Sequence, residues 1–390
     1  MATSHSQHTE TATPSSYMDA LEKVIEEVIA PAAVEIDQSG SYPRAGMEAL
    51  GRAGLLGLIS ATEVGGLGLG HRAATEVVGR IAEVCASTAM VLCMHYAGTA
   101  VIEAYGPREI REAIAAGRHI TTLAFSEAGS RSHFWAPTSS ARPVERDGQN
   151  NTVRLDAKKS WATSAGQADS YVWSSRPLSA EGASTLWLVP ATAPGLSIPT
   201  PFNGLGMRGN SSSPIIAENV RIPLEYMLGP DGSGFDIMMG VVLPYFQLMN
   251  AAVSLGIMEA ATRSTAQHAS RTSYEHLGST LADLPTIRAY IARMRVRAAM
   301  VRGLLLDTLS ALESGRPDTM LRLLEVKAAA GEAATEVTDL AMRVCGGAAF
   351  RKEVGVERNF RDARAATVMA PTTDMLYDFI GKAVTGLPLF

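Results

Sequence analysis

The chain of 390 residues is long enough to bury a large core and longer than a typical domain, so two or three domains are expected. Its net charge of −5, with acidic and basic residues interspersed, provides no basic surface for phosphate groups and argues against a nucleic-acid-binding protein. Its three cysteines lack a metal-ligand spacing and are odd in number, which favours reduced thiols in a cytoplasm, with no structural metal.

The N-terminal part of the chain is predicted to be a tail followed by helices. Residues 1–16 are polar, without a basic start or an apolar run, and predict a disordered tail rather than a signal peptide. Residues 17–119 carry apolar residues at helical spacing, with breaks at Gly and Pro, and predict an N-terminal helical domain. The glycine-rich stretch 63–70 has no strand before it, so we interpret it as a loop between helices.

The rest of the chain changes from strands back to helices. Residues 120–232 contain short runs of alternating apolar and polar residues, separated by Gly, Pro, Asn and Asp, and predict a middle β domain. Helical periodicity returns in long segments over residues 233–390, which suits a helical bundle. We expect no apolar run long enough to cross a bilayer and hence no membrane partner. Helices, strands and helices again, without a repeat, predict an α+β chain.

Several short segments stand out in chain order. They are YPRAGMEALGRAGLLGLISATEVGGLGLG, LAFSEAGSRS, KKSWATS, GMRGNSSSPIIAENVRIPLEYMLG, SRTSYEHLG, VCGGAAF and FRDAR. Together they resemble the acyl-CoA dehydrogenase superfamily: its N-terminal signature, its first flavin loop, its tryptophan strand, the last strands of its β domain, and the segments that reach a neighbouring subunit's flavin. The resemblance covers essentially the whole chain after the tail.

This resemblance implies a fold and a cofactor. The fold is α+β and acyl-CoA dehydrogenase-like, with an N-terminal helical domain, a middle β-barrel domain and a C-terminal four-helix bundle. The resemblance implies that the cofactor would be FAD, that the assembly would be a homotetramer or a dimer, and that the electrons would leave to an acceptor protein or to oxygen.

The resemblance also implies which residues of the chain meet the flavin. Phe125 and Ser126 would contact its pyrimidine edge and Ser132 its pyrophosphate, because small residues let backbone N–H groups approach anionic oxygens. Trp161 would cover one face of the flavin ring and Thr163 would bind the central ring. Without the surrounding motif, a tryptophan in an alternating strand is more often packed in a core.

A second group would reach the flavin of a neighbouring subunit. Arg271, with Tyr274, resembles a pair that contacts the diphosphate, a role to which a guanidinium is suited. Gly346 and Gly347 would let the backbone approach the cofactor, although glycines at a helix end are also common caps. Arg343 stands where many relatives have a glutamine near the flavin.

The chain departs from the family at the catalytic position. In the family a glutamate removes the Cα proton while the β-hydrogen leaves as hydride, but the residue eight positions after Asp362 is Ala370. The position on the next helix where some relatives carry this glutamate is Phe246. A positioned base contributes roughly 10²–10⁴-fold to a rate, so an unmodified mechanism is doubtful. Thr372, two residues on, matches a threonine that touches the dinucleotide.

The predicted substrate contacts also differ. The family's arginine near the thioester and CoA is matched by Gln247, and a nearby aspartate by Pro244, so CoA recognition stays open. The backbone N–H of Ala370 still offers a hydrogen bond to a substrate carbonyl.

Three residues are candidates to replace the missing base. Asp374 lies one helical turn after Ala370, although it also suits a solvated carboxylate at a helix start. Tyr245 reaches the same region from the neighbouring helix unless it is a packed aromatic. His95 lies in an apolar helix, either as a hydrogen-bonded core histidine or as the group that would hold an oxygen adduct of the flavin.

Three functions therefore remain open at this stage. The first is an FAD-dependent oxidoreductase that acts at Cα–Cβ of an acyl thioester, bound to CoA or to a carrier protein, with a non-standard or relocated base. The second is a flavin-dependent monooxygenase on the same scaffold. The third is a non-catalytic protein that binds an acyl group or a partner.

Overall fold

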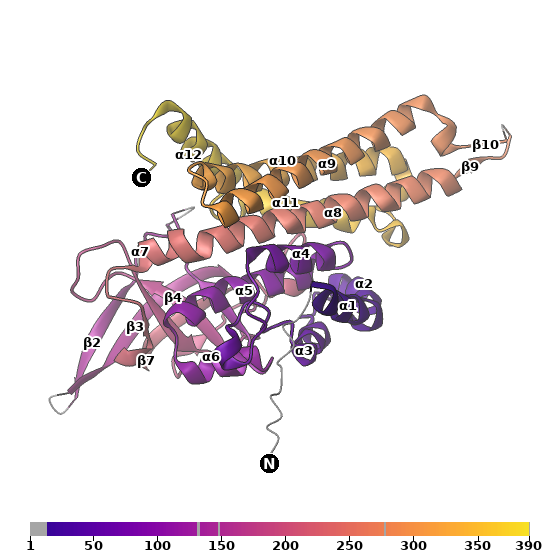
Figure 1. The fold of residues 1–390 in the computed structure, drawn as a ribbon. Coiled ribbons are helices and arrows are strands. Elements are labelled where there is room, and N and C mark those ends of the chain that lie inside the picture. Colours follow the sequence, from indigo (N-terminus) through magenta and orange to yellow (C-terminus); the bar gives the residue numbers. More distant parts are fainter. Residues whose placement is uncertain (1–13, 131–132, 147–148, 277, 390) are drawn as a thin grey trace, which may run out of the picture.

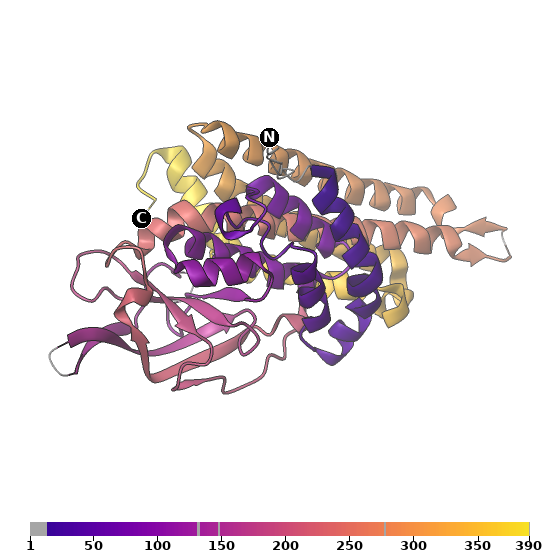
Figure 2. The same cartoon turned by 60° about the horizontal axis from the view of Figure 1, so that its bottom comes forward.

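The computed structural model describes residues 14–130, 133–146, 149–276 and 278–389 (Figure 1). Helices form both ends of the described chain and strands its middle, so the predicted α+β order is confirmed. The C-terminal helices lie across one side of the molecule, while the N-terminal helices and the β domain lie next to each other on the other side (Figures 1 and 2).

The N-terminal part consists of helices around one apolar helix. They are α1 (Pro14–Val24), α2 (Ala30–Ser39), α3 (Arg44–Arg52), α4 (His71–Ala82), α5 (Ala86–Tyr105) and α6 (Arg108–Ala115). Helix α1 begins within the last residues of the predicted tail, and a π-helical turn, Ile25–Ile29, joins it to α2. Helix α5 is apolar around most of its circumference, so it is buried between α4, α8 and β1.

The middle domain contains two four-stranded sheets, which together form the predicted β domain. The first has the order β1 (Thr121–Ala124), β4 (Ser170–Ser175), β5 (Thr185–Pro190), β8 (Met227–Leu228). The second has the order β2 (Ser140–Arg146), β3 (Gln149–Ala162), β7 (Ser213–Pro223), β6 (Leu196–Ser197). Only the β1–β4 pairing is parallel among these described strands. Trp173 pairs with Trp187 across β4 and β5, and both are fully buried in the core.

The C-terminal part is a helical bundle. Its helices are α7 (Gly234–Ile237), α8 (Leu243–Arg271), α9 (Pro285–Ser314), α10 (Thr319–Cys345), α11 (Val356–Val368) and α12 (Thr373–Thr385). Helix α10 packs against α8, α9 and α11 to give the expected four-helix bundle, and α12 is added to its side. The short strands β9 (Ser273–Tyr274) and β10 (Ser279–Thr280) project beyond the bundle where α8 ends (Figures 1 and 2).

Single turns of helix complete the described chain. A π-helical turn, Met238–Val242, joins α7 to α8. The 3₁₀ turns are Thr62–Val64, Arg208–Asn210, Leu224–Tyr226, Leu281–Asp283, Gly346–Phe350 and Lys352–Val354.

Helix α8 and the turns before it pack against helices of both the N-terminal and the C-terminal parts of the chain. This stretch, Gly234–Arg271, is long and apolar enough to cross a membrane, contrary to the expectation from sequence. However, 83% of its most apolar window is buried inside the protein, against α4, α5, α10 and α11. Its apolar character is therefore accounted for by core packing.

Candidate functional site

A small cavity lies where the three parts of the chain meet, and we call it the junction pocket. Its volume is about 70 Å³. Its lining comes from α5, from β1 and the residues after it, from β3, from the start of α8 and from the segment before α12: Met94, Leu123, Phe125, Ser126, Phe134, Ser160, Trp161, Val242, Leu243, Phe246 and Ala370. The fold thus brings together four predicted site residues from three segments that are far apart in sequence: Phe125, Ser126, Trp161 and Ala370.

Trp161 is displayed at this pocket rather than packed in a core. The residue is 71% exposed, and its φ of +58° is unusual for a bulky residue. The register of β3 against β7 shifts between Lys159 and Ala162, which turns the indole out of the regular strand pattern. Thr163, two residues on, is buried and lies 3.2 Å from the Ser212 hydroxyl. A flat apolar ring held outward next to a cavity suits contact with a planar ligand.

A buried ion pair fixes the two segments that carry these residues. Lys159 Nζ lies 2.6 Å from Glu127 Oε1, and both side chains are almost fully buried. Backbone N–H groups of Thr138 and Ser139 donate to the same carboxylate. Burial alone would raise the pKa of Glu127, but the charge of Lys159 and the side-chain hydrogen bonds from Lys159, Ser139 and Thr138 lower it to about 2. The pair joins the loop after β1, with Ser126, to the end of β3, with Trp161.

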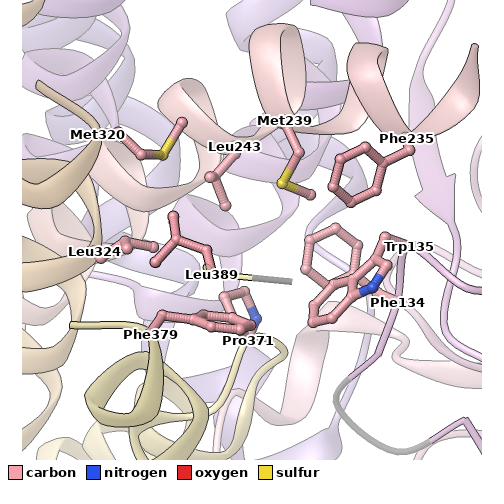
Figure 3. Close-up of a pocket in the computed structure, with 10 residues that line it drawn as sticks. All are labelled: Phe134, Trp135, Phe235, Met239, Leu243, Met320, Leu324, Pro371, Phe379 and Leu389. Carbon is pink, nitrogen blue, oxygen red and sulfur yellow. The ribbon is translucent and has the colours of Figure 1, made fainter. Parts of the chain in front are cut away.

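A larger cavity adjoins the junction pocket, and we call it the apolar pocket (Figure 3). Its volume is about 160 Å³. The lining is entirely aliphatic and aromatic: Phe134, Trp135, Phe235, Met239, Leu243, Met320, Leu324, Pro371, Phe379 and Leu389. Phe134 and Leu243 are walls of both cavities, so the two are neighbours. Figure 3 shows the side chains of α8, α10 and α12 meeting those of the loop after β1 around this space.

His95 has the surroundings of a hydrogen-bonded core histidine, the first of the two alternatives that the sequence left open. The backbone N–H of Thr121 donates to its Nδ1 at 3.2 Å, so Nε2 carries the proton and donates to the Leu56 carbonyl at 3.0 Å. Burial lowers the pKa of His95 to about 4, which keeps the ring neutral. Both nitrogens are used by the backbone, and neither remains for a ligand.

The other two candidate bases also lie outside the cavities. The ring of Tyr245 stacks on His71 with centroids 3.8 Å apart, and burial raises the pKa of Tyr245 to about 12. Asp374 is exposed in the first turn of α12. No titratable side chain occurs among the described residues that line either cavity. The missing glutamate is therefore not replaced by a carboxylate or imidazole in the described pocket walls.

The residues expected to serve a neighbouring subunit lie at the other end of the bundle. Arg271 is the exposed last residue of α8, and Tyr274 lies in β9 with its ring against His276. At about 1.5 Å per residue, the helix between Phe246 and Arg271 spans about 37 Å. Arg271 and Tyr274 therefore cannot reach the junction pocket of their own chain.

Arg343 and the two glycines gather at this same distant end. The Arg343 guanidinium donates to the Tyr290 hydroxyl at 3.1 Å and lies over its ring, so the end of α10 meets the start of α9 there. Gly346 has a φ of +55°, and a Cβ added at Gly346 or Gly347 would meet no described atom within 4 Å. The backbone at these glycines is open to a ligand or partner.

Three further residues, Thr372, Ser132 and Gln247, were predicted to contact the cofactor or the substrate. Thr372 caps α12 by accepting the Met375 N–H, and Ser132 lies outside the described residues. Gln247 is fully buried on α8 and lines neither cavity, and neither of its amide atoms has a hydrogen-bond partner among the described residues.

Comparison with known proteins assigns the family. Family models for the acyl-CoA dehydrogenase N-terminal, middle and C-terminal domains match residues 11–117, 122–220 and 232–385. The short-chain specific mitochondrial acyl-CoA dehydrogenase of Bos taurus is 31% identical over 90% of this chain and 84% of its own. Cyclohexane-1-carbonyl-CoA dehydrogenase of Syntrophus aciditrophicus is 30% identical over 93% and 94%.

Solved structures share the fold. Butyryl-CoA dehydrogenase from Megasphaera elsdenii superimposes with a TM-score of 0.86 at 22% identity, covering 97% of this chain and 100% of its own. A prolyl acyl carrier protein oxidase gives 0.84 at 17% identity, covering 96% and 100%. The three matched domains, their order and the relatives of 30% identity or more show that the chain belongs to the acyl-CoA dehydrogenase family of flavin oxidoreductases.

Proposed function

We propose that this protein binds FAD and oxidises an acyl thioester in the junction pocket. The observation that carries the proposal is the outward-facing Trp161 at a cavity that also contains Phe125, Ser126 and Ala370. The substrate is held on CoA, as for the dehydrogenase relatives, or on a carrier protein, as the name of the prolyl acyl carrier protein oxidase indicates for that neighbour.

The residues present fit a flavin dinucleotide. The exposed indole of Trp161 offers a flat surface for a ring system, and the open space at Gly346 and Gly347 would admit a ligand close to the backbone. The guanidinium of Arg271 suits a diphosphate. When bound, FAD supplies the acceptor for a hydride.

The residues that would bind the cofactor lie at two ends of the molecule, and those at one end cannot reach the pocket at the other end of their own chain. A complete site therefore requires more than one subunit. Arg271 and Trp161 lie at opposite ends of α8, so a complete site combines the junction pocket of one chain with the bundle end of another. A closed dimer or a homotetramer satisfies this arrangement. Exposed apolar residues on α9, Val296, Met300 and Leu306, provide surface for such packing.

Within the site, the chain's own residues bind and orient the thioester. The Ala370 N–H donates to the carbonyl oxygen, and the neighbouring apolar pocket receives the apolar part of the acyl group and excludes water. An apolar cavity of about 150 Å³ accepts benzene, so the pocket suits a short, branched or cyclic acyl group. The Cα proton passes to a base other than the described pocket walls, since the methyl of Ala370 accepts none.

A second candidate function is oxygenation of the bound substrate. It is favoured by one observation, the absence of a titratable side chain among the described residues that line the cavities. A monooxygenase of this kind inserts one oxygen atom of O₂ into the substrate and releases the other as water, using two electrons and two protons from an external reductant such as a reduced nicotinamide, without a base beside Cα.

The location and the electron acceptor are parts of the same proposal. The three free, buried cysteines suit a reducing compartment such as the cytoplasm. The electrons pass to an acceptor protein in the dehydrogenase reaction and to oxygen in the second candidate function.

Anaerobic titration of the purified flavoprotein with acyl thioesters tests the proposal. The panel contains butyryl, isobutyryl, cyclohexanecarbonyl and glutaryl groups on CoA and on a carrier protein, and the visible absorbance of the flavin is followed. Bleaching by an apolar member supports thioester oxidation. Unchanged absorbance with every member contradicts it, and oxygen uptake by the externally reduced protein with a hydroxylated product then supports oxygenation. Purification without flavin, and no uptake of added FAD, supports a binding protein.

A further inference from the structure

A buried lysine, Lys327, lies directly behind the pocket wall that contains Ala370. It projects from α10 and is 1% exposed. Its Nζ donates to three main-chain carbonyls, those of Ala366 at 3.1 Å, Met369 at 3.0 Å and Pro371 at 2.7 Å. Three donors of an ammonium group thus meet three acceptors, all within the turn that ends α11 and precedes α12.

The position of the charge indicates a role in this turn. Lys327 has no ion-pair partner among the described carboxylates, and its Nζ lies 5.9 Å from the centroid of the Phe246 ring. Burial lowers the pKa of Lys327 to about 7. A buried cation without a counter-ion is costly, so its three carbonyl partners at the negative end of α11 are what hold it there.

The Met369 carbonyl connects this cation to the pocket. It belongs to the same peptide unit as the Ala370 N–H, and in a planar trans peptide the two groups point in opposite directions. The carbonyl faces Lys327, so the N–H faces away from it, and Ala370 lines the junction pocket. No described residue accepts a hydrogen bond from this N–H.

We propose that Lys327 is a positioning residue that fixes the turn around Ala370 and polarises the Met369–Ala370 peptide, so that its N–H donates a stronger hydrogen bond to the substrate carbonyl. Hydrogen bonds in a chain strengthen one another, most of all when the first donor is charged. The inference rests on the proposed function, because it assigns the thioester carbonyl to the Ala370 N–H.

Lys327→Met tests this role, because methionine keeps most of the apolar stem and removes the charge and the donors. Lys23→Met, at an exposed position on α1, is the matched control. Lys327→Gln keeps two N–H donors without a charge and replaces the methionine variant if that protein does not fold. Flavin content and thermal unfolding are recorded first for each variant.

The main readout is the carbonyl stretch of a bound probe, measured at pH 6, where Lys327 is protonated. The probe is the pivaloyl thioester of pantetheine with a ¹³C carbonyl, which has no α-hydrogen to lose. A stronger hydrogen bond lowers the stretching frequency. We expect a downshift in the wild type and in Lys23→Met, and a clearly smaller one in Lys327→Met.

The second readout is kinetic. With a thioester that bleaches the flavin, the kcat of Lys327→Met should fall roughly tenfold to a hundredfold with little change in KM.

The outcomes separate this inference from the proposed function. An equal downshift in wild type and Lys327→Met overturns the inference and leaves the function intact. If the wild type binds no thioester, the proposed function fails. Hydrogen–deuterium exchange of the peptide over 366–373 then decides: faster exchange in Lys327→Met than in Lys23→Met supports the positioning role, and equal exchange overturns it.

Discussion

At the scale of single residues, buried polar side chains have clear structural tasks. His95 bridges two backbone groups, Thr121 N–H and the Leu56 carbonyl, that would otherwise be unsatisfied between α5 and its neighbours. Burial keeps the His95 ring neutral in the folded protein. At acid pH the unfolded chain binds a proton that the folded protein excludes, so the free energy of unfolding falls. Burial of a histidine therefore has a consequence that a titration can measure.

Replacing His95 should reduce the loss of the free energy of unfolding as the pH falls from neutral to acid. The folded pKa of about 4 lies below the ordinary histidine value of 6.5, so above pH 6.5 both states are neutral and nothing is lost. As the pH falls from 6.5 to 4, the unfolded chain binds a proton that the folded protein excludes, and on the order of 3 kcal/mol is lost. His95→Gln should be less stable at pH 7 but lose less on acidification, in urea unfolding at pH 7 and 4.5.

The matched control is His133→Gln, at an exposed histidine. Between pH 7 and pH 4.5 this variant should lose as much free energy of unfolding as the wild type. A His95→Gln protein that loses as much stability as the wild type between the two pH values would contradict the assignment.

At the scale of secondary-structure elements, the Glu127–Lys159 pair holds the loop after β1 to β3. Because a lone buried charge is poorly solvated, removing one partner costs more than the pair contributes. The elements that carry Ser126 and Trp161 should therefore loosen together when the pair is broken.

Glu127→Gln should lower the free energy of unfolding by roughly 3–5 kcal/mol, because Lys159 is left buried without its partner. The double variant Glu127→Gln with Lys159→Met should recover part of this loss. Glu112→Gln, in an exposed pair with Arg108, should change stability by less than about 1 kcal/mol. Guanidinium unfolding measures all of these, and similar losses for Glu127→Gln and Glu112→Gln would refute the role of the buried pair.

The helices and strands could be predicted from the sequence more reliably than the polar contacts between residues that are far apart in the chain. Periodicity indicated the helical, strand-containing and helical parts, and the motif around Trp161 indicated the junction pocket, where Phe125, Ser126 and Ala370 were also found. The three candidate bases were chosen by proximity in sequence or family topology, and none lines a described cavity. Lys327 and Glu127–Lys159 were missed, since their partners lie 32 or more residues away and backbone carbonyls leave no sequence signal.

At the scale of the whole molecule, α8 separates two half-sites. The junction pocket lies at its beginning, and Arg271 with β9 lies at its end, beyond the body of the bundle (Figure 1). A chain built this way is incomplete as a monomer if both ends bind one cofactor. Subunit mixing can test this directly.

Trp161→Ala and Arg271→Ala proteins should each retain less FAD than the wild type. When the two are unfolded, mixed and refolded together, mixed dimers contain one site with both native residues, because each site takes Trp161 from one chain and Arg271 from the other. Random pairing restores about a quarter of the sites. Flavin absorbance per protein measures the recovery, and no recovery above the average of the parents would show that the residues do not share a site.

The central claim is that an acyl thioester is oxidised in the junction pocket with residue 370 beside its Cα. The most direct measurement is the rate of anaerobic flavin bleaching by a thioester in wild type, Ala370→Glu and Ala370→Gln. Glutamate supplies the missing base at this pocket wall, whereas glutamine has the same size and accepts no proton. We predict a gain of roughly 10²-fold or more for Ala370→Glu and none for Ala370→Gln. Equal rates in the two variants, with any thioester that binds, would contradict the claim.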